Sequence, residues 1–309
     1  MARVLVTGGA GFIGSHLTEM LVERGDKVRV LDNFSSGNPE NLAGLAGSIE
    51  LVRGDLREPA DVQKAVSKVE LIFHQAAFVS VPQSIENPRE CYAINVTGTI
   101  ELLEAARRSG VRRIVLASSA AVYGPPQELP QRESAQTVCL SPYAASKAFN
   151  ETLAKLYSLA HQLPVVALRY FNVYGPRQSP VSAYAAVIPQ FIQRLESGQA
   201  PQVFGDGKQT RDFIYISDVV RANLLAAEAE SAAGQIFNIC SGVEASLFDL
   251  LEGLASIFPN APRAEFTDPR LGDVARSLGD PTLAEKVLGF RSEVPLGEGL
   301  TRCVAGSAK

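Results

Sequence analysis

The sequence is poor in the residues that build metal centres and disulfide frameworks. It has only four cysteines and three histidines in 309 residues. None of the cysteines forms a C-x-x-C pair, and the histidines are too widely spaced for a local metal motif. The residues concerned are Cys91, Cys139, Cys240, Cys303, His16, His74 and His161. We expect free, mostly buried thiols, a packed core histidine at position 74, and no metal.

Long hydrophobic runs and a surplus of basic charge are also missing. No window approaches the 18 or so apolar residues of a membrane span, and the formal net charge is -4. The composition is that of an ordinary soluble globular protein, and the first residues enter a β-rich run without a signal-peptide pattern. We expect a cytoplasmic protein with a small-molecule partner and no nucleic acid or membrane.

A glycine-rich turn follows the first apolar run. Residues 4–7 read as a strand, and Gly8, Gly11 and Gly14 come next, before a helical pattern that Gly25 ends. Such glycines let backbone amides approach a pyrophosphate at the start of a helix. The triplet alone is weak, since plain turns also use glycine.

Asp32 makes this signal strong. It ends the next strand, 28–31, where a carboxylate accepts hydrogen bonds from the adenosine ribose. A carboxylate repels a 2'-phosphate, and Asn33, Phe34, Ser35 and Ser36 supply no arginine to bind one. NAD is therefore favoured over NADP.

Strands and helices then alternate, which predicts an α/β fold with a Rossmann-type, doubly wound parallel sheet. Strands are expected at 49–52, 71–74, 112–118 and 165–170, with helices at 58–67 and 87–108. Asp55 is placed to meet the adenine, and Ala76 and Ala77 to let the diphosphate approach. The alternatives are a turn role for Asp55 and packing for the two alanines.

A serine and a tyrosine–lysine pair carry the predicted chemistry. Ser119 ends a strand, and Ser141 and Pro142 are good first residues for a helix in which Tyr143 and Lys147 share a face. The ammonium is expected to favour the phenolate, giving a base near neutral pH. The spacing alone can arise by chance, but the pair lies downstream of the nucleotide signature. A tyrosine base beside a nicotinamide cofactor indicates oxidation of an alcohol to a ketone, with Ser119 hydrogen-bonded to the oxygen of that alcohol.

The pattern changes after Asn172. A long irregular segment covers 175–189, a strand and tight turn are expected at 203–207, and a strand near 210 precedes helices at 218–229 and 246–257. We expect a smaller mixed α/β C-terminal substrate domain. The proposed division is 1–172 plus roughly 212–242 for the NAD-binding domain, and 173–211 with 243–309 for the substrate domain. Arg211 and Arg270 are candidate diphosphate ligands, or solvated surface charges.

Several motifs together resemble one family. They are Thr7–Gly14, His74–Ala77, Asn95–Gly98, Ser118–Gly124, Tyr143–Lys147, Arg169–Asn172 and Thr210–Phe213. They are similar to those of extended short-chain dehydrogenases/reductases of the NAD-dependent epimerase/dehydratase family, in particular nucleotide-sugar 4-epimerases, and the resemblance covers nearly the whole chain. It implies an isomerase with tightly held NAD, which oxidises C4 of a UDP-hexose and returns hydride to the opposite face of the rotated 4-keto sugar.

The resemblance also implies roles for individual residues. Ser119, Tyr143 and Lys147 would be catalytic. The cofactor would be bound by Gly8, Gly11, Phe12, Ile13, Gly14, Asp32, Asn33, Phe34, Ser35, Ser36, Gly37, Asp55, Leu56, Gln75, Ala76, Ala77, Val79, Asn95 and Ala117, with Phe171 nearby. The UDP group would be held by Asn172, Phe204, Arg211, Arg270 and Asp273. The helix after Asn87 and the Tyr143 helix would form a four-helix homodimer interface.

Small differences bear on the subfamily. Ala120 and Ala121 stand where 4,6-dehydratases of this family carry an Asp–Glu pair, and Ser179 stands where glucuronate epimerases place an arginine. Residues 178–189 resemble those of epimerases that accept UDP-N-acetylhexosamines. Ser277 replaces a bulky tyrosine that restricts the pocket, so we expect UDP-GlcNAc and UDP-GalNAc to be accepted beside UDP-Glc and UDP-Gal. The alternatives are a UDP-glucuronate epimerase or decarboxylase, a reductase that releases its product, and a dinucleotide-sensing module without turnover.

Overall fold

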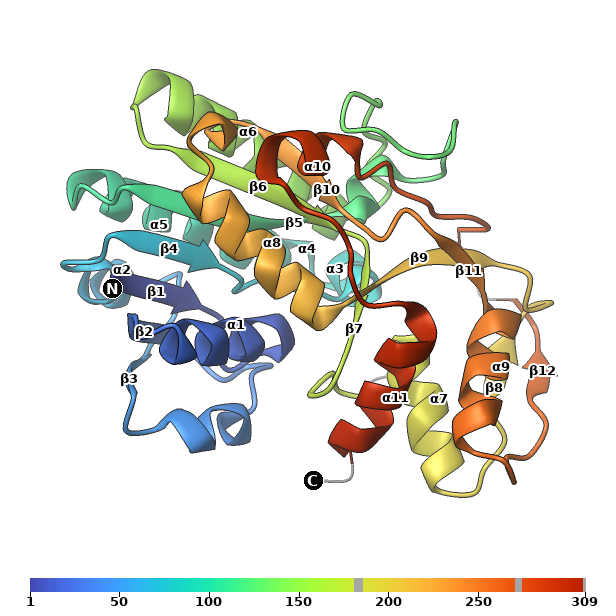
Figure 1. Ribbon diagram of the computed structural model, residues 1–309. Coiled ribbons are helices and arrows are strands. Elements are labelled where there is room, and N and C mark those ends of the chain that lie inside the picture. The colour runs from blue at the N-terminus through green and yellow to red at the C-terminus, as the bar shows by residue number, and fades with distance from the viewer. Residues whose placement is uncertain (181–185, 270–273, 308–309) are drawn as a thin grey trace.

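The larger part of the chain is built on one parallel sheet (Figure 1), in a computed structural model that describes residues 1–180, 186–269 and 274–307. Seven strands lie in the order β10-β6-β5-β4-β1-β2-β3, and every neighbouring pair is parallel. Their bounds are β1 Arg3–Thr7, β2 Lys27–Asp32, β3 Ile49–Arg53, β4 Leu71–His74, β5 Arg113–Ser119, β6 Val165–Tyr170 and β10 Ile236–Ile239. The strand order reverses direction between β1 and β4, which makes the sheet doubly wound and confirms the predicted fold class.

Helices cover both faces of this sheet (Figure 1). One face packs α1 Phe12–Glu23, α8 Ile216–Glu228 and α10 Thr282–Leu288, and the other packs α2 Pro59–Val66, α5 Gly98–Arg108 and α6 Pro142–Ala160. Alternate residues of β1 show why: Val4 and Val6 lie in one apolar cluster, and Leu5 lies in the other. All three side chains are fully buried, as expected for a central strand of a parallel sheet.

The predicted helix 87–108 is interrupted. Its residues form α4 Pro88–Tyr92, a π-helical turn η2 Ala93–Thr97, and then α5. A short helix, α3 Val81–Glu86, precedes it and was not predicted. Three 3-10 segments complete this part: η1 Pro39–Leu45, η3 Ala120–Tyr123 and η4 Glu230–Ala232. π-helical turns are frequently found at functional sites, and this one contains Asn95.

In its described residues, the smaller C-terminal lobe contains two small sheets and three helices. The sheets are β11-β9-β7 and β12-β8, from β7 Asn172–Tyr174, β8 Gln202–Phe204, β9 Thr210–Tyr215, β11 Glu244–Ser246 and β12 Glu265–Thr267. The helices are α7 Val187–Glu196, α9 Leu247–Ile257 and α11 Leu296–Ser307. The expected strand at 203–204 exists, but it pairs in parallel with β12 rather than continuing through the turn onto β9. The exact division of the chain into two domains stays a prediction.

Candidate active site

The glycine turn after β1 lies at the edge where dinucleotides bind in such sheets. Gly8 has a φ of +68°, and a Cβ there would lie 2.7 Å from the backbone of Ala76. A Cβ on Gly14 would lie 2.0 Å from the carbonyl oxygen of Gly8. Both positions require glycine, because any side chain would push apart the turn and the strand end that flank the helix start. The first turn of α1 has no side-chain cap, which suits a phosphate-binding helix start.

Asp32 lies where the predicted ribose acceptor should be. Its Oδ2 accepts a hydrogen bond from the backbone N–H of Ala10 at 2.9 Å, and its Oδ1 accepts one from Phe34 at 2.8 Å. Gly37 passes close by, and a Cβ on it would lie 3.0 Å from Oδ1. These contacts fix the carboxylate at the carboxyl end of β2.

A cavity of about 280 Å³ opens beside this carboxylate. Ten of the predicted cofactor residues line it: Gly8, Asp32, Asn33, Ser35, Ser36, Asp55, Leu56, Ala76, Ala77 and Val79. Asn33 donates a hydrogen bond to Asp55 at 2.7 Å, and the Arg57 guanidinium holds the pKa of the Asp55 carboxyl well below its usual range. An anionic, hydrogen-bonding wall beside the glycine turn fits the adenosine half of a dinucleotide.

The cavity also has walls that sequence reasoning missed. They are Leu31, Gly54, Phe78, Ser80, Gln83, Glu90 and Ile94. Ser80 caps α3, and its Oγ accepts a hydrogen bond from the N–H of Gln83. A serine followed by proline in the first helical turn is a helix-start signal that would have located this wall.

The remaining predicted cofactor residues are not among those that line this cavity. Phe12, Ile13 and Gly11 begin α1, while Phe34 and Gly37 belong to the loop after β2. Asn95 acts through a neighbour, because its side-chain amide exchanges hydrogen bonds with both backbone groups of Phe78, at 2.7 and 3.0 Å. Gln75 donates to Tyr170 and Asn223, and Phe171 packs in a buried cluster with Tyr123.

His74 is the packed core histidine expected from the sequence. Burial lowers its pKa to about 3, so the ring is neutral. Its Nδ1 lies 2.7 Å from Thr7 Oγ1 and its Nε2 lies 3.0 Å from Thr99 Oγ1. Since the Thr99 hydroxyl donates to the carbonyl of Asn95, Nε2 is the protonated nitrogen and donates to Thr99. The imidazole thus ties the end of β1 to the first turn of α5.

The three predicted catalytic residues come together at the carboxyl ends of β5 and β6. Ser141 caps α6, and its Oγ accepts from the N–H of Ala144 at 3.1 Å, which places Tyr143 in the first turn as predicted. Ser119 ends β5 and forms a hydrogen bond with the Tyr143 hydroxyl. Lys147 is only 4% exposed; its Nζ donates to the carbonyl of Ala117 at 2.8 Å and lies 5.8 Å from the centre of the Tyr143 ring.

The expected lowering of the Tyr143 pKa is not found. Burial raises the pKa of Tyr143, and the hydrogen bond with Ser119 only partly opposes this. Lys147 is directed to Ala117 instead of the phenol oxygen, and burial lowers its own pKa to about 8. The charge of the ammonium alone predicts a lowered pKa for Tyr143, but the desolvation of both groups outweighs that effect.

The predicted UDP ligands are only partly described. Arg270 and Asp273 lie outside the described residues. The Asn172 side chain donates to the backbone carbonyl of Asp212 at 3.0 Å, and Arg211 Nη1 donates to that of Thr210 at 2.8 Å. Phe204 is half-buried at the end of β8. These residues belong to the small sheets of the C-terminal lobe.

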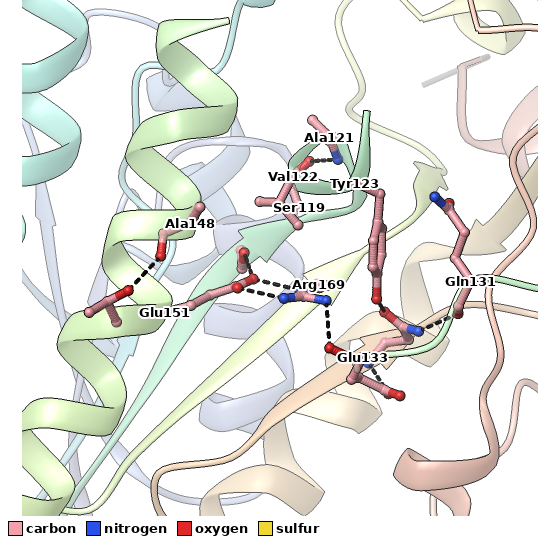
Figure 2. Close-up of polar contacts among 12 residues, drawn as sticks. Ser119, Ala121, Val122, Tyr123, Gln131, Glu133, Ala148, Glu151 and Arg169 are labelled. Carbon is pink, nitrogen blue, oxygen red and sulfur yellow. Dashed lines mark hydrogen bonds and ion pairs between the residues drawn. The ribbon is translucent and has the colours of Figure 1, made fainter. Parts of the chain in front are cut away.

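Below Ser119 lies a buried polar cluster that the sequence did not reveal (Figure 2). Glu151 of α6 forms a two-bond ion pair with Arg169 of β6. The Arg169 guanidinium stacks over the Tyr123 ring at 4.6 Å. Arg169 belongs to one of the quoted motifs, but the sequence offered no means of finding its partner in a different element.

Comparison with known proteins agrees with this geometry. The profile of the NAD dependent epimerase/dehydratase family matches residues 4–240. The chain belongs to this family. It is an enzyme with NAD as its cofactor, and the glycine cradle and Asp32 fit that group.

Relatives of known description extend over nearly the entire length. The chain is 41% identical to a UDP-glucose 4-epimerase of Mycolicibacterium smegmatis, covering 98% of this chain and 97% of the relative. It is 38% identical to a UDP-N-acetyl-alpha-D-glucosaminuronate decarboxylase of Bacillus cytotoxicus, covering 98% of this chain and 96% of the relative.

Among solved structures, a UDP-N-acetylglucosamine 4-epimerase from Methanobrevibacter ruminantium in complex with UDP-N-acetylmuramic acid superposes with a TM-score of 0.95 at 36% identity. It covers 99% of this chain and 98% of that one. A Thermus thermophilus UDP-glucose 4-epimerase complex with NAD gives 0.89 at 37% identity, with 98% of each chain covered.

Three further observations bear on the predicted absences. All four cysteines are free thiols, and three of them are buried. Within the described ranges, His, Cys, Asp and Glu side chains form no group of three or more that could hold a metal ion. In the same ranges no helix combines the length and apolarity needed to cross a membrane.

Proposed function

We propose that this protein is an NAD-dependent 4-epimerase of UDP-hexoses. The observation that carries the proposal is the set of Ser119, Tyr143 and Lys147 beside a segment that offers no second acid or base. Ala120 and Ala121 follow Ser119 directly and begin η3, so only methyl groups stand where a dehydratase of this family carries its Asp–Glu pair.

The residues divide the chemistry among them. Tyr143 removes the proton from the C4 hydroxyl, Ser119 bonds the same oxygen, and the Lys147 ammonium stabilises the phenolate. NAD, held by the glycine turn and Asp32, would supply the hydride chemistry at C4, which is removal of hydride and its later return. Between these two events the 4-keto sugar rotates, and Tyr143 gives the proton back to the oxygen of the new alcohol.

The purified protein should be incubated separately with UDP-Glc, UDP-Gal, UDP-GlcNAc and UDP-GalNAc, with and without added NAD, and the sugars followed by NMR. We expect interconversion of 4-epimers without net NADH. Accumulation of NADH with a released keto product would indicate an oxidoreductase, and no conversion of any sugar would refute the epimerase proposal.

Ser277 supports acceptance of N-acetylated sugars. It is half-buried in a segment fixed on two sides: its N–H donates to the carbonyl of Thr210 at 3.1 Å, and Gln131 donates to the carbonyl of Leu278 at 2.8 Å. Because backbone hydrogen bonds fix this segment, the small side chain of Ser277 leaves space in the proposed sugar pocket that a tyrosine would fill.

The first prediction therefore concerns Ser277→Tyr. We expect kcat/KM for UDP-GlcNAc to fall by about a hundredfold while UDP-Glc conversion changes less than about threefold, since only the larger sugar meets the added ring. Steady-state kinetics with both sugars measure this. Retention of N-acetyl activity would refute the pocket argument.

A second candidate is a decarboxylase or epimerase of UDP-glucuronate, favoured by the 38% identity to a decarboxylase. UDP-glucuronate and its N-acetylated form are the test substrates, with CO2 release as the readout. We propose the neutral-sugar reaction over this one because Ser179 stands in place of the carboxylate-binding arginine.

We further propose a homodimer formed through α6 and its neighbours α3 and α4. Phe149, Leu156 and Leu159 recur at helical spacing along α6 and remain 44%, 48% and 84% exposed. Ile85 of α3 and Tyr92 of α4 add exposed apolar surface. Such a stripe fits a second copy of the same helices. A cytoplasmic location is also proposed, in keeping with the free thiols.

A further inference from the structure

Glu151 of α6, which follows Lys147 by one helical turn, forms a buried ion pair with Arg169 of β6. Figure 2 shows this pair. Glu151 is 4% exposed and Arg169 is 3% exposed. Arg169 Nε donates to Glu151 Oε1 and Nη2 donates to Oε2, each at 2.7 Å. A buried pair is often no more stabilising than two apolar side chains of the same volume. Fold stability therefore does not account for its place here.

The Glu151–Arg169 pair is also hydrogen-bonded to β5, the strand that ends in Ser119. Ser118, the neighbour of Ser119, donates to Glu151 Oε1 at 2.6 Å. Lys147 donates to the carbonyl of Ala117 at 2.8 Å. Consecutive residues of β5 thus hold consecutive turns of α6, and the catalytic serine lies immediately after both contacts.

The charges around Lys147 give Glu151 a second effect. Tyr143 lies on the same helix, Cys91 comes from α4, His74 from β4 and Arg169 from β6. Tyr143 and Cys91 are neutral at pH 7 because burial raises the pKa of each. His74 is neutral because burial lowers its pKa to about 3.

Glu151 is thus the anion that acts on the ammonium of Lys147. Burial lowers the pKa of Lys147 to about 8, and the charges of Cys91 and then Glu151 oppose that change. Because burial raises the pKa of the Cys91 thiol, Glu151 supplies the negative charge at pH 7. Arg169, which carries the opposite charge, lies beyond Glu151 on β6 and fixes its carboxylate.

We propose that Glu151, clamped by Arg169 and Ser118, is a positioning residue that holds Lys147 at the catalytic strand and keeps it cationic. The kinetic part of this inference rests on the proposed epimerase function. The titration of Lys147 does not, because it needs neither substrate nor turnover.

The main test is the double variant Glu151→Met with Arg169→Met, which removes both charges and fills the same volume with apolar side chains. Glu151→Gln is the second variant and keeps the shape of the side chain. Two quantities are measured: the pH profile of kcat for UDP-sugar conversion, and the NMR titration of Lys147 labelled at Cε in the substrate-free protein.

We expect both measurements to move in the same direction. The alkaline midpoint of kcat and the Lys147 titration shift to lower pH, and kcat at pH 8.5 falls about fivefold or more relative to kcat at pH 7. KM for the UDP-sugar changes less than about twofold, because Glu151 does not touch substrate.

The control is Asp218→Asn. Asp218 is also a buried carboxylate, and it pairs with Arg221 at 3.0 Å, but its other bonds run to Ser292, Glu293 and Val294. This variant should lose stability and keep the alkaline midpoint.

An unshifted Lys147 titration in either folded Glu151 variant overturns the proposal. Loss of fold in both also overturns it, because the pair is then structural. A shifted titration without epimerase activity upholds it while removing the proposed function.

Discussion

Burial changes the pKa values of side chains at this site as much as neighbouring charges do. The pKa of Lys147 lies at about 8, below that of an exposed lysine, because water is excluded from its ammonium. Above pH 8 the folded protein has lost a proton that the unfolded chain still holds. Stability from this group therefore rises with pH between about 8 and 10.5, while the cation needed for catalysis disappears.

This leads to a prediction for Lys147→Met. The variant should lose at least about a thousandfold in kcat, since the phenolate loses its counter-charge. It should also show a flatter dependence of unfolding free energy on pH between 8 and 10 than the native protein. Denaturant unfolding across that pH range measures the second effect, and an unchanged slope would contradict the assignment of the low pKa to Lys147.

At the same scale, Asp32 should determine the choice of cofactor. In Asp32→Ser we expect the affinity for NAD to fall about tenfold or more, because a charged hydrogen-bond acceptor is lost. We also expect a smaller difference between the affinities for NAD and NADP, because the carboxylate no longer repels the 2'-phosphate. Calorimetric titration with each dinucleotide checks this. A variant that still rejects NADP as strongly as the native protein would show that another residue excludes the 2'-phosphate.

At the scale of elements, the start of α6 sets the position of Tyr143. Ser141→Ala removes the cap and should cost about 1 kcal/mol of stability. Ser246→Ala removes the equivalent cap of α9, which is reinforced by Asp249, and should cost a similar amount. Only Ser141→Ala should lower kcat, because only α6 carries catalytic residues. Urea unfolding and kinetics of the two variants separate the effects; equal kcat in both would contradict a positioning role for the cap.

Elements with strong local signals were predicted well, and those defined by distant partners were not. The glycine turn, Asp32 and the capped start of α6 are each written in a few consecutive residues. The pairing of β8 with β12 joins segments some sixty residues apart, and each strand has only 3 residues, which is too short for a periodic pattern to be recognised. The π-helical turn at Asn95 depends on bonds to Phe78 and Ser146, which no local pattern encodes.

At the scale of the whole molecule, the apolar stripe of α6 should decide the assembly state. In Leu156→Lys we expect a monomer, because a buried ammonium at the interface lacks a partner. Phe248→Lys, at an exposed aromatic on α9, serves as the control and should leave the dimer intact. Light scattering after gel filtration distinguishes the two outcomes. A native protein that is monomeric at micromolar concentration would refute the dimer.

The loop between η3 and α6 also depends on distant chain. Gln131 exchanges backbone hydrogen bonds with Leu278 and Asp280, and the N–H of Asn238 in β10 donates to Glu133. During synthesis, the catalytic residues leave the ribosome long before residues 236–280 do. Until then β6 is an open edge strand without its neighbour β10, and the loop above the site has nothing to close against. The nascent chain therefore carries Ser119, Tyr143 and Lys147 on an unfinished sheet, whose exposed edge at β6 is open to pairing with other chains until β10 arrives.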